Sequence, residues 1–414
     1  MEIVGKNQKD RRSQFCSALA GTLTLAMVLG VGDRSSAQLT PDTSLGSEAS
    51  SLTENLVIRG LPGDRVDGGA QRGPNLFHSF WQFNVAAGRG VYFSNPAGVN
   101  NILTRVTGNN PSQILGRLGV LGNANLFLLN PNGIVFGPNA SLDVAGSFVA
   151  STASALALGE SGQFSATTPD SSTLLAVEPG ALFLNALTAG SGTITNQGNL
   201  TAGQDLTLVA NRLELQGQLR AGRDLTLQAA DTIQLRDSAT APFIAQAGRN
   251  LLTQGNQSLD IAILNHPDSR LISGGDMVLR SGNPVIGDAH YSSGGNLRIE
   301  QLDGSPGSLI SPNDPIFQVE GDFSLLDYSG GSLQILAGGS VTILGDVEVD
   351  TAAASFIDTT ITLSDGTVVD VDGTNRPVLD IRAGTTAFFG IPTPGVATSA
   401  DIRIDGLITV GTSG

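Results

Sequence analysis

Downstream of residue 196 the chain repeats a pattern in which a glycine and a small polar residue precede apolar residues at every second position. Alternation with a period of two is typical of a strand that is buried on one face. The glycine and the polar residue are typical of a turn before each strand. The pattern occurs as AGQDLTL from 202, AGRDLTL from 221, AGRNLLT from 247, SGGDMVL from 273, SGGNLRI from 293, VEGDFSL from 319 and AGGSVTI from 337.

These segments begin 18 to 26 residues apart, which is the spacing of solenoid repeats. Equivalent segments one coil apart would place their inward-facing side chains above one another and so build a continuous core. We therefore predict an all-β fold, a parallel β-helix (β-solenoid) of about 15 to 18 coils. The alternative is an antiparallel sandwich, in which strands and hairpin turns would recur about every 8 to 12 residues.

Two segments depart from the repeat. The segment GPNLFHSFWQFNV contains Phe77, Phe80, Trp81 and Phe83, and we predict that it belongs to an aromatic-rich cap over the N-terminal end of the solenoid. In TTITLSDGTVVDVDGT, the pair Asp365–Gly366 separates two alternating runs, which predicts a protruding hairpin.

The first 37 residues have the three parts of a secretory signal peptide. Basic residues, among them Lys9 and Arg12, precede the apolar segment FCSALAGTLTLAMVLGVG, and SSAQ then offers a cleavage site between Ala37 and Gln38. A retained membrane anchor is the alternative. Cleavage would remove the single cysteine, Cys16, so the exported chain would fold without disulfides.

Charge restricts the kinds of partner. The formal net charge is −15, and no lysine follows Lys9, so every later basic residue is an arginine. Binding to phosphate backbones requires clusters of Lys and Arg, and we therefore predict no nucleic-acid partner.

The segment NPNGI, Asn130 to Ile134, carries a turn signal within a strand-rich region. Pro131 presets φ for the second position of a turn, Asn132 tolerates the third, and Gly133 completes it. The Asn130 and Asn132 side chains can bond nearby backbone groups. The segment is therefore either a corner that fixes strand register or a surface that a partner reads, and both roles can coexist.

Three stretches together resemble the secretion domain of the filamentous haemagglutinin family, the exoproteins of two-partner secretion. They are LFHSFWQFNV (76–85), GRGVYFSNPAGVNNILTRVTG (88–108) and PSQILGRLGVLGNANLFLLNPNGIVFGPNASLDVAGSFVAST (111–152). NPNGI matches a family motif in full. At the position of the family's NPNL motif this chain has NPAG, so only Asn95 and Pro96 correspond to it.

The resemblance implies a right-handed parallel β-helix that leaves a Gram-negative-type cell by way of the periplasm. The implied partners are the general secretory translocon and an outer-membrane β-barrel transporter with periplasmic POTRA domains. A secreted or cell-surface adhesin with a host-cell or surface ligand is the implied role. We predict a signal peptide over 1–37, a secretion domain with its cap over 38–300, and continuing coils over 301–414.

An extracellular β-helical polysaccharide lyase or hydrolase is the alternative function. Such an active site needs paired carboxylates in a groove, often with a basic residue. The candidates are Asp365, Asp370, Asp372, Asp401 and Asp405, with Arg382 and Arg403.

Metal chemistry has little support in the sequence. The histidines His78, His266 and His290 lack ligand spacing, and VDVDGTN lacks the distal glutamate of a calcium loop. We therefore predict a non-enzymatic protein without cofactor or metal.

Overall fold

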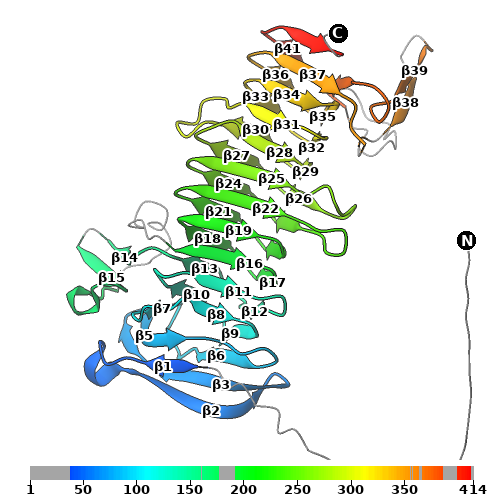
Figure 1. The fold of residues 1–414 in the computed structure, drawn as a ribbon. Coiled ribbons are helices and arrows are strands. Elements are labelled where there is room, and N and C mark those ends of the chain that lie inside the picture. Colours follow the sequence, from blue (N-terminus) through cyan, green and yellow to red (C-terminus); the bar gives the residue numbers. More distant parts are fainter. Residues whose placement is uncertain are drawn as a thin grey trace, which may run out of the picture. The chain divides into compact units, whose positions relative to one another are not determined.

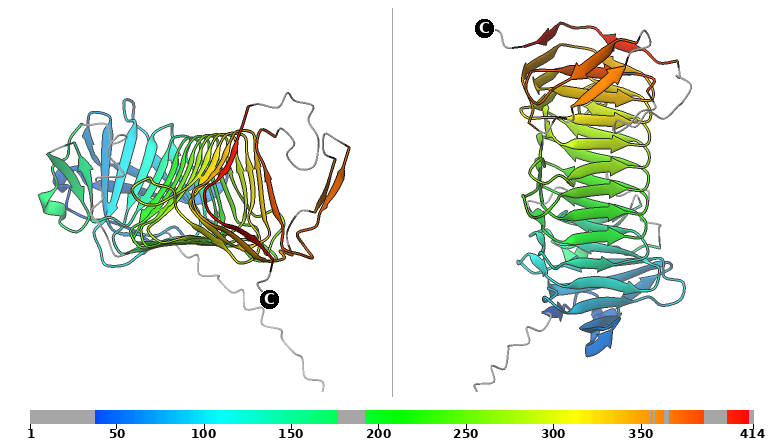
Figure 2. Two further views of the ribbon diagram at one scale, coloured as in Figure 1. Left: turned by 90° about the horizontal axis from the view of Figure 1, so that it is seen from above. Right: turned by 90° about the vertical axis from the view of Figure 1, so that its right-hand side faces the viewer.

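The computed structural model describes residues 38–159, 161–176, 192–354, 356, 358–362, 366–385 and 399–411. These residues belong to one compact unit, Ser36–Gly414, in which successive coils lie over one another (Figures 1 and 2). From β7 onward successive coils contribute strands to three sheets, which we call the first, second and third sheets in the order that the chain passes through them within one coil.

The first sheet pairs β1 (Leu39–Pro41), β5 (Asn75–Phe83), β7 (Asn101–Val106), β10 (Asn125–Leu129), β13 (Phe148–Ser151), β18 (Leu206–Ala210), β21 (Leu225–Ala229), β24 (Leu251–Gly255), β27 (Met277–Ser281), β30 (Leu297–Glu300), β33 (Phe323–Leu325), β36 (Val341–Ile343) and β41 (Ile402–Ile404), with β4 (Ala70–Arg72) beside β5. The second sheet pairs β8 (Ser112–Ile114), β11 (Ile134–Phe136), β16 (Thr193–Asn196), β19 (Arg212–Leu215), β22 (Thr232–Arg236), β25 (Ser258–Ala262), β28 (Val285–Asp288), β31 (Leu309–Ser311), β34 (Tyr328–Gly331), β37 (Val347–Thr351) and β42 (Ile408–Val410). The third sheet pairs β2 (Ser50–Ile58), β3 (Leu61–Gly68), β6 (Gly90–Ser94), β9 (Arg117–Leu121), β12 (Ser141–Asp143), β17 (Asn199–Ala202), β20 (Gln218–Ala221), β23 (Ile244–Ala247), β26 (Arg270–Ser273), β29 (His290–Ser293), β32 (Ile316–Val319), β35 (Leu333–Ala337) and β40 (Leu379–Arg382).

The register of the coils confirms the predicted parallel β-helix. Leu206 and Leu208 of β18 lie opposite Leu225 and Leu227 of β21, and all four side chains are buried in the shared core. The pairs from β5 to β41 within the first sheet are parallel, which excludes the antiparallel sandwich.

The coil number expected from the repeat length was too high. Among the described residues the three sheets hold 14, 11 and 13 strands, fewer than the expected total of about 15 to 18 coils. The reason is that the chain leaves the stack twice, after β13 and after β37. The first departure contains the hairpin β14 (Ala155–Leu158) and β15 (Gly162–Ser165), and the second contains β38 (Thr359–Thr362) and β39 (Val368–Val371).

The β38–β39 hairpin is the predicted one, with Asp370 on its second strand. Asp365 lies outside the described residues. The β14–β15 hairpin was not predicted from the sequence. The short 3-10 helices η1 (Gly46–Glu48) and η2 (Pro169–Ser171) complete the described elements.

Antiparallel strands close the N-terminal end of the coils. β1 and β4 pair with β5, and β2 pairs with β3, the first parallel strand of the third sheet. The predicted aromatic residues lie on β5 itself, the first strand of the parallel stack, and not on the strands that cover it. Phe80 and Phe83 are buried in an edge-to-face contact with ring centroids 5.1 Å apart.

The outer face of the first sheet is also covered in the early coils. Phe77, Leu103 and Phe127 point away from the main core and pack in a second apolar cluster with residues of the β14–β15 hairpin. Phe77 meets Phe164 of β15 with ring centroids 5.0 Å apart. β5 and β7 are therefore buried on both faces over most of their length, in contrast to the one-sided strands further along the chain.

A ladder of side-chain hydrogen bonds joins the coils at the corner between the third and first sheets. At this corner the polar residue of each repeat accepts a hydrogen bond from the backbone N–H of its counterpart in the next coil. The bonds run from Asp224 N to Asp205 Oδ1 (3.2 Å), Asn250 N to Asp224 Oδ1 (3.1 Å), Asp276 N to Asn250 Oδ1 (3.1 Å), Asn296 N to Asp276 Oδ1 (2.9 Å), Asp322 N to Asn296 Oδ1 (2.8 Å) and Ser340 N to Asp322 Oδ1 (2.7 Å). The repeated Asp or Asn thus connects coils as well as turning the chain.

Removing one step of this ladder should be mildly destabilising. Asn250→Ala deprives the N–H of Asp276 of its acceptor at a solvent-exposed corner, and we expect a loss of about 1 kcal/mol in the free energy of unfolding. Asn250→Asp keeps the accepting oxygen and is expected to unfold at nearly the wild-type urea concentration. Equal midpoints for the alanine variant and the wild type in urea titrations would contradict the proposed contribution of the ladder.

Candidate functional site

The NPNG segment forms the corner between β10 and β11, where the chain passes from the first to the second sheet. The backbone N–H of Gly133 donates to the carbonyl of Asn130 at 3.1 Å, and the N–H of Asn132 donates to Asn130 Oδ1 at 3.0 Å. Gly133 has a φ of +119°, which favours glycine at this position. Pro131 occupies the second position of the turn, where its ring fixes φ.

Both asparagine side chains also reach the preceding coil. Asn130 Nδ2 donates to the carbonyl of Asn110 at 3.1 Å and to Ser112 Oγ at 3.0 Å. Asn132 Nδ2 donates to the carbonyl of Gly108 at 2.7 Å. These side chains therefore join the corner to the preceding coil, in addition to the backbone hydrogen bond from the N–H of Ser112 to the Gly133 carbonyl.

The members of this corner differ in exposure. Asn130 and Ile134 are fully buried, and the Ile134 side chain lies in the main core. Pro131 is half-buried and Asn132 is exposed. A protein partner could therefore contact the Asn132 side chain and the edge of Pro131. Asn130 is inaccessible to a partner and stabilises the fold through its hydrogen bonds within the chain.

Asn95 and Pro96 form a different corner, between β6 of the third sheet and β7 of the first. Asn95 Oδ1 accepts from the N–H groups of Asn123 (3.0 Å) and Ala124 (3.1 Å) in the next coil, and its Nδ2 donates to the carbonyl of Val99 at 2.9 Å. Pro96 is exposed. The two candidate motifs thus lie at different corners of the coil and do not form one site.

The predicted signal peptide and Ala37 lie outside the described residues. Gln38 is described, and its carbonyl accepts from the N–H of Asn84 at 3.0 Å while Gln82 Nε2 donates to its Oε1 at 3.1 Å. The described chain therefore begins against the last residues of β5. No helix within the described ranges is long and apolar enough to cross a membrane.

The side chains considered for catalysis do not gather in one groove within the described part of the chain. Arg382 pairs with Asp380 at 2.6 Å, and Arg403 pairs with Asp405 at 2.6 Å, two residues away on the same stretch in each case. Asp372 accepts hydrogen bonds from Thr374 and Asn375 in its own turn, which lower the pKa of its carboxyl group. Such local pairs are typical of a solvated outer face.

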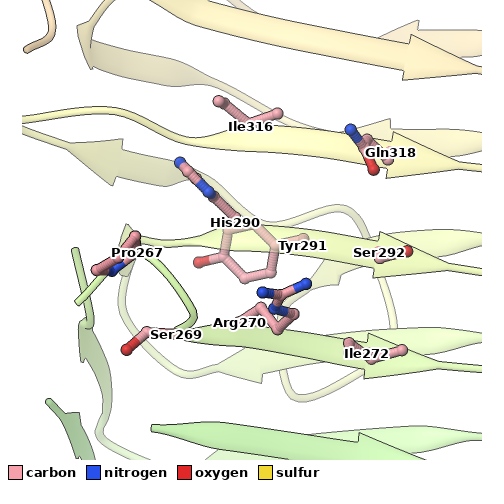
Figure 3. A pocket seen from close by; sticks show the side chains of 9 residues that line it. All are labelled: Pro267, Ser269, Arg270, Ile272, His290, Tyr291, Ser292, Ile316 and Gln318. Atoms are coloured by element: carbon pink, nitrogen blue, oxygen red, sulfur yellow. The ribbon is translucent and has the colours of Figure 1, made fainter. Parts of the chain in front are cut away.

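A shallow pocket of about 270 Å³ lies on the outer face of β26, β29 and β32 (Figure 3). Arg270, Ile272, His290, Ile316 and Gln318 are among its lining residues, and no carboxylate lines it. It therefore lacks the pair of carboxylates that glycoside hydrolysis uses. His290 Nε2 lies 3.7 Å from Asp314 Oδ2, and among the described residues no group of three or more His, Cys, Asp or Glu side chains could hold a metal ion.

His78, by contrast, is fully buried in the N-terminal coils. Its ring centroid lies 5.2 Å from that of Phe93, and its Nδ1 is 3.0 Å from Ser50 Oγ. Burial lowers the pKa of His78 to about 3, against a smaller opposing effect of Asp67. The residue is therefore neutral at physiological pH and packs in the core beneath the cap.

Arg105 was missed by the sequence interpretation. Although it is fully buried on β7, its guanidinium donates to Ser79 Oγ (2.9 Å), Ser44 Oγ (2.8 Å), Ser172 Oγ (2.6 Å) and the carbonyl of Ser165 (2.6 Å). It also lies over the Phe164 ring, 4.5 Å from the centroid. Arg105 thus connects three parts of the chain: the cap, the coils and the segment around the β14–β15 hairpin.

The comparison with family models identifies the family of this chain. The sequence model of the TPS secretion domain matches residues 37–299, more than half of the chain, and the protein belongs to this family, the two-partner secretion exoproteins. Proteins of this class are exported from Gram-negative cells and have an outer-membrane transporter partner. The resemblance identified from residues 76–152 is thereby confirmed.

The individual relatives are distant. A segment of 78 residues is 35% identical to the Heme/hemopexin-binding protein of Haemophilus influenzae, and it covers 19% of this chain but 8% of that protein. The HMW1 secretion domain from Haemophilus influenzae aligns with 14% identity and a TM-score of 0.38, over 87% of this chain and 99% of that one. The filamentous hemagglutinin secretion domain aligns with 16% identity and a TM-score of 0.33, over 90% and 99%.

Proposed function

We propose that residues 38–300 deliver this exoprotein to its outer-membrane transporter, and that the exposed part of the Asn130–Gly133 corner is a surface that the transporter reads. Membership of the family implies that the partner is an outer-membrane transporter. The observation that carries the proposal is the difference in exposure within the motif, since Asn130 and Ile134 are buried whereas Asn132 is exposed. The Asn132 side chain also donates to the Gly108 carbonyl, so the proposal assigns it a contact with the transporter in addition to this contact between coils.

The proposed route begins with residues 1–37 as a signal peptide for the general secretory translocon, cleaved between Ala37 and Gln38. Recognition then occurs in the periplasm, through the POTRA domains of the transporter. The coils after residue 300 continue the same three sheets, because β30 pairs with β33 and β28 with β31. We propose a non-enzymatic adhesin role for the exported protein, with a host-cell or surface ligand.

The corner can be tested by comparing three asparagines. Asn132→Ala loses the side-chain hydrogen bonds to the Gly108 carbonyl and to Asn130 Oδ1 at an exposed position. We expect a stability loss of about 1 kcal/mol and a drop in secreted protein of about tenfold or more. Asn139→Ala is the matched control, because Asn139 is an exposed residue of the next turn, GPNA, in the same coil. We expect it to be secreted as the wild type is.

Asn130→Ala distinguishes folding from recognition. It removes buried hydrogen bonds to Asn110, Ser112 and Asn132, and we expect it to destabilise the purified chain by about 2 kcal/mol. Secretion is measured by the amounts of chain in the medium and in the periplasm, and stability by urea unfolding. Normal secretion of a stably folded Asn132→Ala variant would rule out recognition through this side chain.

A further inference from the structure

The segment that contains the NPNG corner is poor in charged residues. No Asp, Glu, Lys or Arg occurs between Arg105 and Arg117 or between Arg117 and Asp143, in a chain with a net charge of −15. The carboxylate of Asp42 lies close to this segment, because it accepts from Thr107 Oγ1 at 2.6 Å. Depletion of charge is typical of the centres of protein interfaces.

Trp81 lies beside this uncharged corner. It is the only tryptophan of the chain, and it is 53% exposed on β5 even though its neighbours Phe80 and Phe83 are buried. A Cβ on Gly108 would lie 3.2 Å from Cδ2 of the indole and 2.1 Å from the Trp81 carbonyl oxygen, so the glycine allows Trp81 to lie against the next coil. The same Gly108 accepts the hydrogen bond from Asn132.

Trp81 and Asn132 both lie against the buried Gly108, and they therefore form one patch across three successive coils, those of β5, β7 and β10. An exposed tryptophan presents a large apolar area together with an N–H donor, and tryptophan is enriched among the residues that dominate binding energy. The adjacent exposed amide adds hydrogen-bonding groups without charge.

We propose that Trp81 is the aromatic anchor of the transporter-binding surface, which comprises the exposed Asn132 side chain and the indole. This inference rests on the proposed function of the corner. Family membership implies that the partner which binds this patch is the transporter. Binding of a second copy of the chain is disfavoured, because two chains of net charge −15 repel one another. Because the patch is uncharged, binding should depend little on salt.

The single tryptophan makes the contact directly observable. Labelling the purified chain with 5-fluorotryptophan places one fluorine probe, at Trp81. On addition of the transporter's purified periplasmic region we expect the single ¹⁹F resonance to shift or broaden to saturation. We expect Trp81→Ala to weaken binding about tenfold or more, and Trp81→Phe to weaken it less. The dissociation constant should change by less than about threefold between low and high salt.

Controls separate this inference from the proposed function. Leu302→Ala removes another exposed apolar side chain, 45% exposed and distant in sequence from the corner, and should bind as the wild type does. Far-UV circular dichroism melting confirms that each variant is folded. If Asn132→Ala weakens binding but Trp81→Ala does not and the ¹⁹F resonance stays unchanged, Trp81 is no anchor and the proposed function stands.

The remaining outcomes are equally decisive. Weakened binding by Trp81→Ala with unaffected binding by Asn132→Ala would support the anchor and overturn the role of Asn132. Absence of binding by the wild-type chain would overturn both proposals. A ¹⁹F resonance that broadens with protein concentration in the absence of the transporter would identify the patch as a self-association surface and overturn the inference.

Discussion

Arg105→Leu is expected to lower the free energy of unfolding by about 4 kcal/mol, a large fraction of the stability of a typical domain. The substitution removes hydrogen bonds from the guanidinium to Ser44, Ser79 and Ser172 and to the carbonyl of Ser165. Burial lowers the pKa of Arg105 to about 10, so the native side chain remains charged at neutral pH. The serine hydroxyls and the Ser165 carbonyl would then lose their partner within a buried region.

Asp42 makes the loss larger, because it belongs to the same network. Its carboxylate accepts from Ser79 Oγ at 2.7 Å and from Thr107 Oγ1 at 2.6 Å. Burial alone would raise the pKa of Asp42, but hydrogen bonds from Ser44, Thr107 and Ser79 outweigh it and lower the pKa. Without Arg105 this partly buried carboxylate would lose its electrostatic interaction with the guanidinium.

Urea unfolding of purified variants measures this effect. Arg220→Leu is the matched control, because Arg220 is half-buried on β20 and its guanidinium bonds Gln246 and Gln218 on the outer face. We expect the control to lose less than about 1 kcal/mol. An Arg105→Leu variant as stable as this control would show that the network contributes little.

The second large effect is a loss of stability in acid that depends on His78. The pKa of His78 is lowered to about 3 in the folded protein, whereas an unfolded histidine titrates near 6.5. Between these values the unfolded chain binds the proton and the folded chain does not, so the folded state loses stability as pH falls from about 6.5 towards 3. The contribution, fully present above about pH 6.5, amounts to about 5 kcal/mol at most.

His78→Gln removes this titration while keeping a neutral polar side chain. The variant should be less stable at pH 7, since the packing against Phe93 and the contact with Ser50 change, but its stability should depend less on pH between 6.5 and 4. Free energies of unfolding from denaturant titrations at several pH values give the two slopes. Identical slopes for the variant and the wild type would exclude His78 as the titrating group.

The fold was predictable where one residue type recurs in register. Leu206 and Leu225, or Leu208 and Leu227, occupy equivalent positions in the repeated segments and lie opposite one another in the structure. The number of coils was not predictable in the same way, because the length of the chain does not show that the segments of the β14–β15 and β38–β39 hairpins lie outside the stack.

The candidate site was partly predictable for a similar reason. NPNG identifies a turn from local chemistry, because its bonds between Asn130, Asn132 and Gly133 are short-range. The bonds of Arg105 to Ser44 and Ser172 span more than 60 residues, and nothing in the local pattern of NILTRV indicates these partners. The lack of alternation in that segment is typical of a strand that is buried on both faces, a signal that the sequence interpretation did not use.

The side-chain ladder at the corner between the third and first sheets gives the stack a chemical polarity. In every step the acceptor belongs to the earlier coil and the donor N–H to the later one, as in the bond from Asn250 N to Asp224 Oδ1. A stack that is complete only up to a given coil therefore ends in a free carboxylate or amide oxygen, which water solvates readily. Assembly in the opposite direction would leave backbone N–H groups without acceptors at the end of the incomplete stack. Assembly from the N-terminal coil leaves side-chain oxygens unpaired instead, which costs less free energy.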